Sequence, residues 1–200
     1  MDGRRQRDDQ LIEQLKRAMK TGAYPAREYS WRAPVVSPPV SNAEIAEAEA
    51  RLGFALPPFL QRLYCEVGNG GFGPGYGLFP LDSGSSDLDS IVTAYAAMRA
   101  MTQQEIDENW VDEDDKPSLW PARVLMVCDW GCNIYSLVNC ASSDLRVLRM
   151  DSNANFSEWA VESPSIQQWL ATWLAGEPLF HLQWERAEKV AVAHLSRPAE

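Results

Sequence analysis

The chain has 200 residues, of which 46% are hydrophobic, and a formal net charge of −10. This length suits one large domain or one domain with extensions, and the apolar content argues against global disorder. The acidic balance disfavours nucleic acid and anionic lipid as partners, because the chain would repel their phosphates, and it favours basic proteins.

Neither a membrane span nor a secretion signal is visible in the sequence. The uncharged apolar stretches fall far below the roughly 20 residues of a membrane helix, and the charged N-terminus lacks the apolar core of a signal peptide. Four cysteines are too few and too scattered for the disulfide framework of a small secreted domain. We therefore expect a cytoplasmic protein with reduced thiols.

Residues 1–39 predict a helix followed by a linker. Apolar side chains at helical spacing indicate a helix over residues 9–19, which Asp8 or Asp9 would cap and Gly22 would end. Several prolines follow before residue 40, and they favour an extended surface connection over a regular element.

The next helix has the best-marked boundaries in the chain. Ser41 and Glu44 form a capping box, and Val40 with Ile45 occupies the positions of a hydrophobic staple. Gly53 can adopt the left-handed conformation that ends a helix. The apolar stripe of this helix consists of Ile45, Ala48 and Leu52.

A second helix and a glycine-rich loop follow at once. Pro57 and Pro58 open the helix, whose apolar residues continue at helical spacing to Val67. Residues 68–75 contain five glycines, too many for a regular element, so this segment is predicted to be a shaped loop. It follows a helix and lacks the Lys-Ser/Thr pair of a P-loop, which disfavours phosphate binding.

A third core helix and an acidic segment come next. Asp87 can cap the helix, whose apolar stripe runs to about Met101. Residues 105–115 then hold seven acidic side chains and no basic one, which predicts an exposed acidic lobe.

Three short runs rich in Val, Leu, Ile and Tyr predict an antiparallel meander. They cover residues 123–128, 133–138 and 145–150.

Two further helices are expected near the C-terminus. Ser163 and Pro164 start the first, which Gly176 closes, and Trp169 with Trp173 lies on the face expected to pack against the sheet. A last polar helix is predicted over residues 182–195.

The order of these segments resembles the SMI1/KNR4 family, also called the SUKH superfamily. The resemblance is carried by the capping box, the segment Arg51-Leu-Gly-Phe-Ala-Leu-Pro57, the loop after the second helix and the Trp-Gly-Cys turn between two strands. It covers roughly Val40 to Leu174. The residues that stand in its loop and turn motifs are Asn69, Gly70, Gly71, Gly131 and Cys132.

The resemblance implies an α+β fold, with an antiparallel sheet packed with several helices. The family domain would occupy residues 40–176, between an N-terminal helix with its linker (1–39) and a C-terminal helical extension (177–200). For bacterial members the family implies immunity proteins that neutralise toxins, and for fungal members an interaction scaffold in cell-wall regulation.

Catalytic and metal-binding interpretations find little support. Cys128, Cys132 and Cys140 lack the paired Cys-x-x-Cys spacing of a zinc site, and His181 and His194 are distant in sequence. A cysteine nucleophile would need a base beside it, and carboxylates on a solvated lobe lack the apolar pocket that tunes one of them for acid catalysis. We therefore expect no catalytic residue, no metal and no cofactor.

Two features are candidates for partner binding. Trp130 lies in a turn, where its indole either anchors a partner or folds back over the sheet. The acidic run either only solvates the lobe or steers a basic protein toward it. The residues of this run that we assign to partner binding are Asp112, Glu113, Asp114 and Asp115.

The leading hypothesis is an immunity protein that occludes a basic toxin domain. The alternative is an intracellular adaptor that binds several partners through its flanking segments. An enzyme is a third, less favoured class.

Overall fold

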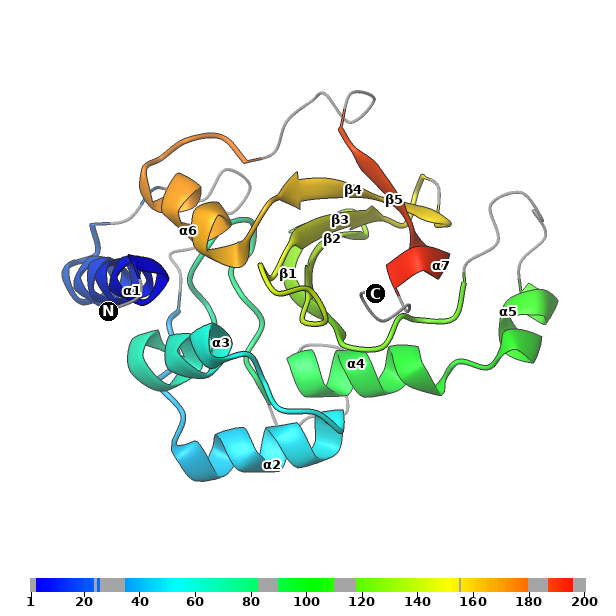
Figure 1. The fold of residues 1–200 in the computed structure, drawn as a ribbon, viewed down its shortest axis with the longest axis horizontal. Helices are drawn as coiled ribbons and strands as arrows, with labels where there is room; N and C mark the ends of the chain where they lie inside the picture. The colour runs from blue at the N-terminus through cyan, green and yellow to red at the C-terminus, as the bar shows by residue number, and fades with distance from the viewer. Residues whose placement is uncertain are drawn as a thin grey trace.

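The structure is a computed structural model of the protein. It describes residues 3–23, 25, 35–82, 90–109, 118–154, 156–179 and 187–195. Five antiparallel strands form one sheet in the order β1-β2-β3-β4-β5 (Figure 1). The strands are β1 (Val124–Gly131), β2 (Ile134–Asn139), β3 (Val147–Asp151), β4 (Glu158–Ser163) and β5 (Lys189–Ala191).

Helices pack around this sheet, which confirms the predicted α+β class. The helices of the described part are α1 (Gly3–Thr21), α2 (Asn42–Leu52), α3 (Pro58–Arg62), the π-helix η1 (Leu63–Val67), α4 (Ile91–Ala100), α5 (Gln103–Asn109), α6 (Ile166–Leu174) and α7 (Val192–Leu195). None of these helices is both long and apolar enough to cross a bilayer.

The N-terminal helix is longer than predicted. It begins at Gly3, so Asp8 and Asp9 lie inside it and the prediction that either caps it is wrong. The carboxylate of Asp9 instead accepts a bond of 2.6 Å from the guanidinium of Arg62 on α3. Gly22 ends the helix with a φ of 69°, as predicted.

The boundaries of α2 are confirmed in full. The Ser41 hydroxyl accepts from the Glu44 amide, and the Glu44 carboxylate accepts from the Ser41 amide at 2.7 Å. Gly53 has a φ of 78° and donates its amide to Glu49. The predicted stripe of Ile45, Ala48 and Leu52 is buried.

The second predicted helix is confirmed as α3, but its second half widens into the π-helix η1.

The third predicted core helix is α4, which begins later than predicted. Ser90 is its N-cap, and its hydroxyl accepts from the Thr93 amide at 3.2 Å, so the predicted cap at Asp87 is wrong. Asp87 itself lies outside the described residues.

Part of the predicted acidic lobe is helical. Thr102 and Glu105 form a second reciprocal cap at the start of α5, and the pKa of the Glu105 carboxyl is lowered because the Thr102 amide and hydroxyl donate to it. Glu105 and Asp107 are exposed, whereas Ile106 between them is buried in the protein.

The meander of three strands is confirmed, and two strands were missed. β5 lies inside the predicted helix over residues 182–195, so that prediction is wrong at residues 189–191. The edge of β4 decides this: the Val161 amide donates to the Glu188 carbonyl at 2.7 Å, and the Val192 amide donates to the Ser157 carbonyl at 2.9 Å. Such non-local pairing overrides local helix propensity.

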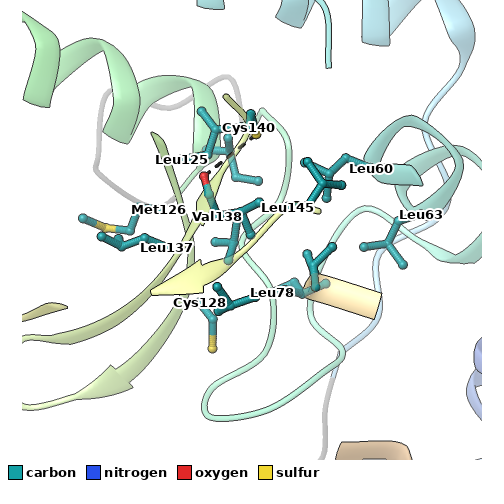
Figure 2. Close-up of a cluster of buried hydrophobic side chains, with 14 of the residues drawn as sticks. Leu60, Leu63, Leu78, Leu125, Met126, Cys128, Leu137, Val138, Cys140 and Leu145 are labelled. Carbon is teal, nitrogen blue, oxygen red and sulfur yellow. Dashed lines mark hydrogen bonds between the residues drawn. The ribbon is translucent and has the colours of Figure 1, made fainter. Parts of the chain in front are cut away.

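The sheet has a different apolar layer on each face. Figure 2 shows Leu60, Leu63 and Leu78 on one side of the β1–β2 pair and Met126 with Leu137 on the other. On the first side lie α1, α3 and α6 (Figure 1), and the second side faces α4 and α7.

Candidate functional site

A pocket of about 310 Å³ opens on the second face of the sheet. Its floor is formed by side chains of β1, β2, β3 and β4, and its walls come from α4, α5 and α7. This volume is at the lower end of the range of about 300–1,000 Å³ that is typical of small-molecule sites. The pocket is therefore large enough to receive a large side chain.

Methionine is the most frequent residue type in the described lining of this pocket. Of the six methionines in the chain, four line it: Met98, Met101, Met126 and Met150. An unbranched thioether side chain adopts many shapes at low cost, so such a surface can adapt to its occupant. None of the lining side chains in the described part of the chain is charged.

Aromatic rings form the rigid part of the pocket. The rings of Trp120 and Trp159 lie with their centroids 5.2 Å apart, and the Trp120 indole donates to the Val124 carbonyl at 2.8 Å. Tyr135 lies next to Met150 on the paired strand. Burial raises the pKa of the Tyr135 hydroxyl, and the Asp129 carboxylate acts in the same direction.

The border of the pocket is apolar and acidic. Met101 is 36% exposed and Leu119, between the lining residues Ser118 and Trp120, is 47% exposed. They are two of the four large hydrophobic residues that are exposed in the described part of the chain. Glu105 and Asp107 flank the lining residue Ile106 on α5.

The structure does not place the predicted acidic contact residues at this border or elsewhere. Asp112, Glu113, Asp114 and Asp115 lie outside the described residues. Their assignment to partner binding remains a prediction.

Trp130 is buried, not exposed. Its side chain keeps 6% of its exposure, its Nε1 donates to the Ser136 hydroxyl at 2.7 Å, and the Arg149 guanidinium lies 5.7 Å from the ring centre. The interpretation of Trp130 as an exposed anchor is wrong in this conformation, and the alternative, an indole folded over the sheet, holds. The structure places Trp130 in strand β1 and not in the turn itself, and its indole bonds to a buried hydroxyl on the neighbouring strand, so closeness to a turn does not predict exposure.

A buried polar network extends from Trp130 to α6. The carboxylate of Glu162 accepts bonds from the Ser136 hydroxyl at 2.6 Å, from Arg149 at 3.0 Å and from the Trp169 indole at 3.0 Å. Arg149 also donates to the Leu179 carbonyl at 3.0 Å. The Arg149 and Glu162 side chains are 7% and 2% exposed, so this ion pair is fully desolvated. The network joins the four strands β1, β2, β3 and β4 to α6 and has a structural role.

Burial raises the pKa of two thiols, Cys65 and Cys140. All four cysteines are free, and only Cys132 is exposed. Burial raises the pKa of the Cys140 thiol to about 12, which keeps it protonated and unreactive at neutral pH. Within the ranges that the structure describes, no three His, Cys, Asp or Glu side chains gather to hold a metal ion.

Comparison with known proteins decides the family. The family model of the SMI1 / KNR4 family (SUKH-1) matches residues 39–172, which agrees with the resemblance seen in the sequence. The chain belongs to the SMI1/KNR4 family (SUKH-1). No curated protein matches it with significant similarity.

The SMI1/KNR4 match contains most of the pocket. Residues 94–159 of the lining lie inside it, whereas Val192 on α7 lies beyond its end. The helix α1 also lies outside the match, yet its residues Ile12 and Leu15 are fully buried. The helices α1 and α7, which flank the family match, therefore belong to the same core.

The loop motif of this SMI1/KNR4 chain is structural. The side-chain oxygen of Asn69 accepts from the Leu81 backbone amide at 2.7 Å, and the backbone amide of Asn69 donates to the Ser37 carbonyl at 3.0 Å. The Gly70 carbonyl accepts from the Ser37 backbone amide. Gly71 has a φ of 79°, and a Cβ there would overlap the Val35 carbonyl oxygen. The close approach of two backbones explains why this position needs glycine.

The turn motif closes the β1–β2 hairpin. Cys132 and Asn133 have φ values of 50° and 60°, as in a two-residue type I′ turn between the paired residues Gly131 and Ile134. The Tyr76 ring covers Gly131, where a Cβ would lie 2.9 Å from the tyrosine oxygen. Asn133 lines the pocket, so the turn forms part of its edge.

Proposed function

We propose that this SMI1/KNR4 protein is an immunity protein, which binds a cognate bacterial toxin and neutralises it by occlusion. The observation that carries the proposal is the family match over residues 39–172, because immunity proteins are known in the SUKH family. The protein acts as a stoichiometric binder and needs no chemistry of its own.

The charge of the chain supports this proposal. A toxin domain that grips nucleic acid is basic, and a partner with a net charge of −10 complements it. Complementary charge accelerates encounter, which matters for a protein that must capture a toxin before the toxin acts.

The polar interior supports binding over catalysis. The buried carboxylate of Glu162 is held by three donors, and the buried thiol of Cys140 stays protonated. Neither group is poised to act as an acid, a base or a nucleophile.

Co-expression tests the proposal. The C-terminal domain of the polypeptide encoded beside this gene is expressed from an inducible promoter, with and without the full chain. We expect growth arrest by the toxin alone, rescue by co-expression, and a 1:1 complex of the purified proteins in light scattering. Continued arrest at high expression of the folded chain, together with absence of a complex, contradicts the proposal.

A second experiment tests steering by the acidic run. In stopped-flow titrations with that toxin domain, the combined change Asp112→Asn, Glu113→Gln, Asp114→Asn and Asp115→Asn should slow association and reduce its salt dependence. The exposed Glu47→Gln on α2 serves as a control and should leave both nearly unchanged. An unchanged association rate and salt dependence of the quadruple variant would contradict the steering role.

A further inference from the structure

We propose that the methionine-lined pocket receives an apolar side chain from a basic segment of the toxin. The inference rests on the proposed function and names the surface through which it works. The occupant is a partner segment in which a large apolar residue is flanked by Lys or Arg.

The pocket is a built cavity and not loose packing. Protein interiors leave few voids larger than a water molecule. A volume of about 310 Å³ between Met98, Met126 and Met150 departs from it. The pocket lies where the flexible methionine side chains are concentrated.

The lining selects an apolar occupant. Its described side chains carry no charge, and the exposed Met101 and Leu119 extend the apolar surface outward from the pocket. Leaving such surface in water is unfavourable, and binding energy at protein interfaces concentrates where an aromatic or aliphatic anchor fills a pocket.

The border selects basic flanks. Glu105 and Asp107, both exposed, flank the lining residue Ile106 on α5. A basic residue beside the anchor would meet these carboxylates, whereas an acidic one would be repelled.

The distribution of charge along the molecule agrees with this choice. Helix α1 carries six basic and three acidic residues, whereas α5 carries three acidic residues and no basic one. Figure 1 places these two helices at opposite ends of the long axis. The field of the protein therefore directs a basic partner to the end that holds the pocket.

Methionine NMR provides the direct test. The full chain is labelled with ¹³C at its methionine methyl groups and titrated with the capped peptides Lys-Arg-X-Arg-Lys, where X is Trp, Leu or Ala. The Trp and Leu peptides should shift the resonances of Met98, Met101, Met126 and Met150 and leave Met19 on α1 unchanged. The Ala peptide should bind at least about tenfold more weakly, because it buries less apolar surface.

Two pairs of variants locate the effect. Ser152→Trp places a ring in the pocket and should abolish the shifts, whereas Ser143→Trp, in the exposed β2–β3 turn, should not. Asp107→Asn should weaken binding of the Leu peptide about threefold at low salt, whereas the matched single change Glu47→Gln should have no effect. An unchanged Met19 resonance shows that each variant is folded.

Several results would overturn the inference. These are the absence of pocket shifts with every peptide, equal affinity for the Leu and Ala peptides, and stronger binding of peptides with Asp and Glu flanks. Shifts caused by free indole but by no peptide would assign the pocket to a small apolar molecule. Shifts that depend only on protein concentration would assign it to a second copy of the chain.

The same variants separate this inference from the proposed function. If wild type and Ser152→Trp protect equally well against the toxin, the immunity function stands and the pocket is not its contact surface. If neither protects but the peptides bind as expected, the toxin assignment fails and the pocket remains a site for basic, apolar segments.

Discussion

The indole Nε1 of Trp130 donates a hydrogen bond of 2.7 Å to the Ser136 hydroxyl, and that hydroxyl donates to the Glu162 carboxylate at 2.6 Å. This relay holds Trp130, two residues before the hairpin turn, inside the protein. The tip of the hairpin, Cys132 and Asn133, is exposed. The fold thus separates a buried tryptophan from an exposed turn within three residues.

Replacing Trp130 with Phe should lower the free energy of unfolding by about 1–2 kcal/mol, because the ring stays buried but the bond to Ser136 is lost. Urea denaturation measures the change. Trp159→Phe is a control for ring size, because this indole is also buried and its Nε1 has no hydrogen-bond partner among the described residues. A weakened toxin complex with unchanged stability would show that Trp130 contacts the partner after all.

Glu162→Gln should destabilise the protein by about 3–5 kcal/mol, because it leaves the Arg149 charge buried without its carboxylate partner. The double variant with Arg149→Met should recover a large part of this loss. Equilibrium denaturation of both singles and the double gives the coupling energy. If the loss of unfolding free energy in the double variant equals the sum of the losses in the two single variants, the ion pair does not couple these positions.

Gly71→Ala should destabilise by more than about 2 kcal/mol, because its backbone has a φ of 79° and its Cβ would overlap the Val35 carbonyl. Gly22→Ala is the matched control. Gly22 has a φ of 69° but open space around its Cβ position, so only the conformational cost of about 1 kcal/mol applies. Thermal unfolding of both variants gives the difference, and equal losses would contradict the steric explanation.

Stability should fall as acid protonates the two helix caps. Glu44 and Glu105 each have a lowered pKa, because the amide and hydroxyl of Ser41 and of Thr102 donate to them. A carboxyl whose pKa is lower in the folded state stabilises the protein above its ordinary value of 4.5, and this contribution is lost as the pH falls through the folded pKa. Glu44→Gln should flatten the acid limb of the stability curve, whereas Glu47→Gln should preserve it.

Leu15→Ala in α1 should destabilise the whole protein by about 2–5 kcal/mol, although α1 lies outside the family match. The exposed Arg17→Ala should have little effect. Circular dichroism during urea unfolding measures both. A single cooperative transition that shifts with Leu15→Ala would show that α1 and the family domain unfold together; an unshifted transition would show α1 to be a dispensable arm.

Local signals in the sequence determined the elements whose boundaries are made locally. The capping box at Ser41 and Glu44 and the left-handed glycines at positions 22 and 53 were read correctly, because each involves hydrogen bonds or backbone angles within a few residues. The same holds for the first three strands, which are joined by short turns. Together with the order of the motifs along the chain, these local signals were enough to recognise the resemblance to the SMI1/KNR4 family.

Only the tertiary structure decided the features that depend on distant partners. The strand β5 exists because β4 offers an unpaired edge, and Trp130 is buried because Ser136 offers an acceptor on the next strand. The pocket gathers four methionines that are spread between residues 98 and 150. The spacing of these residues in the sequence does not predict that they come together, because their proximity depends on the twist and register of the sheet and on the helices packed against it.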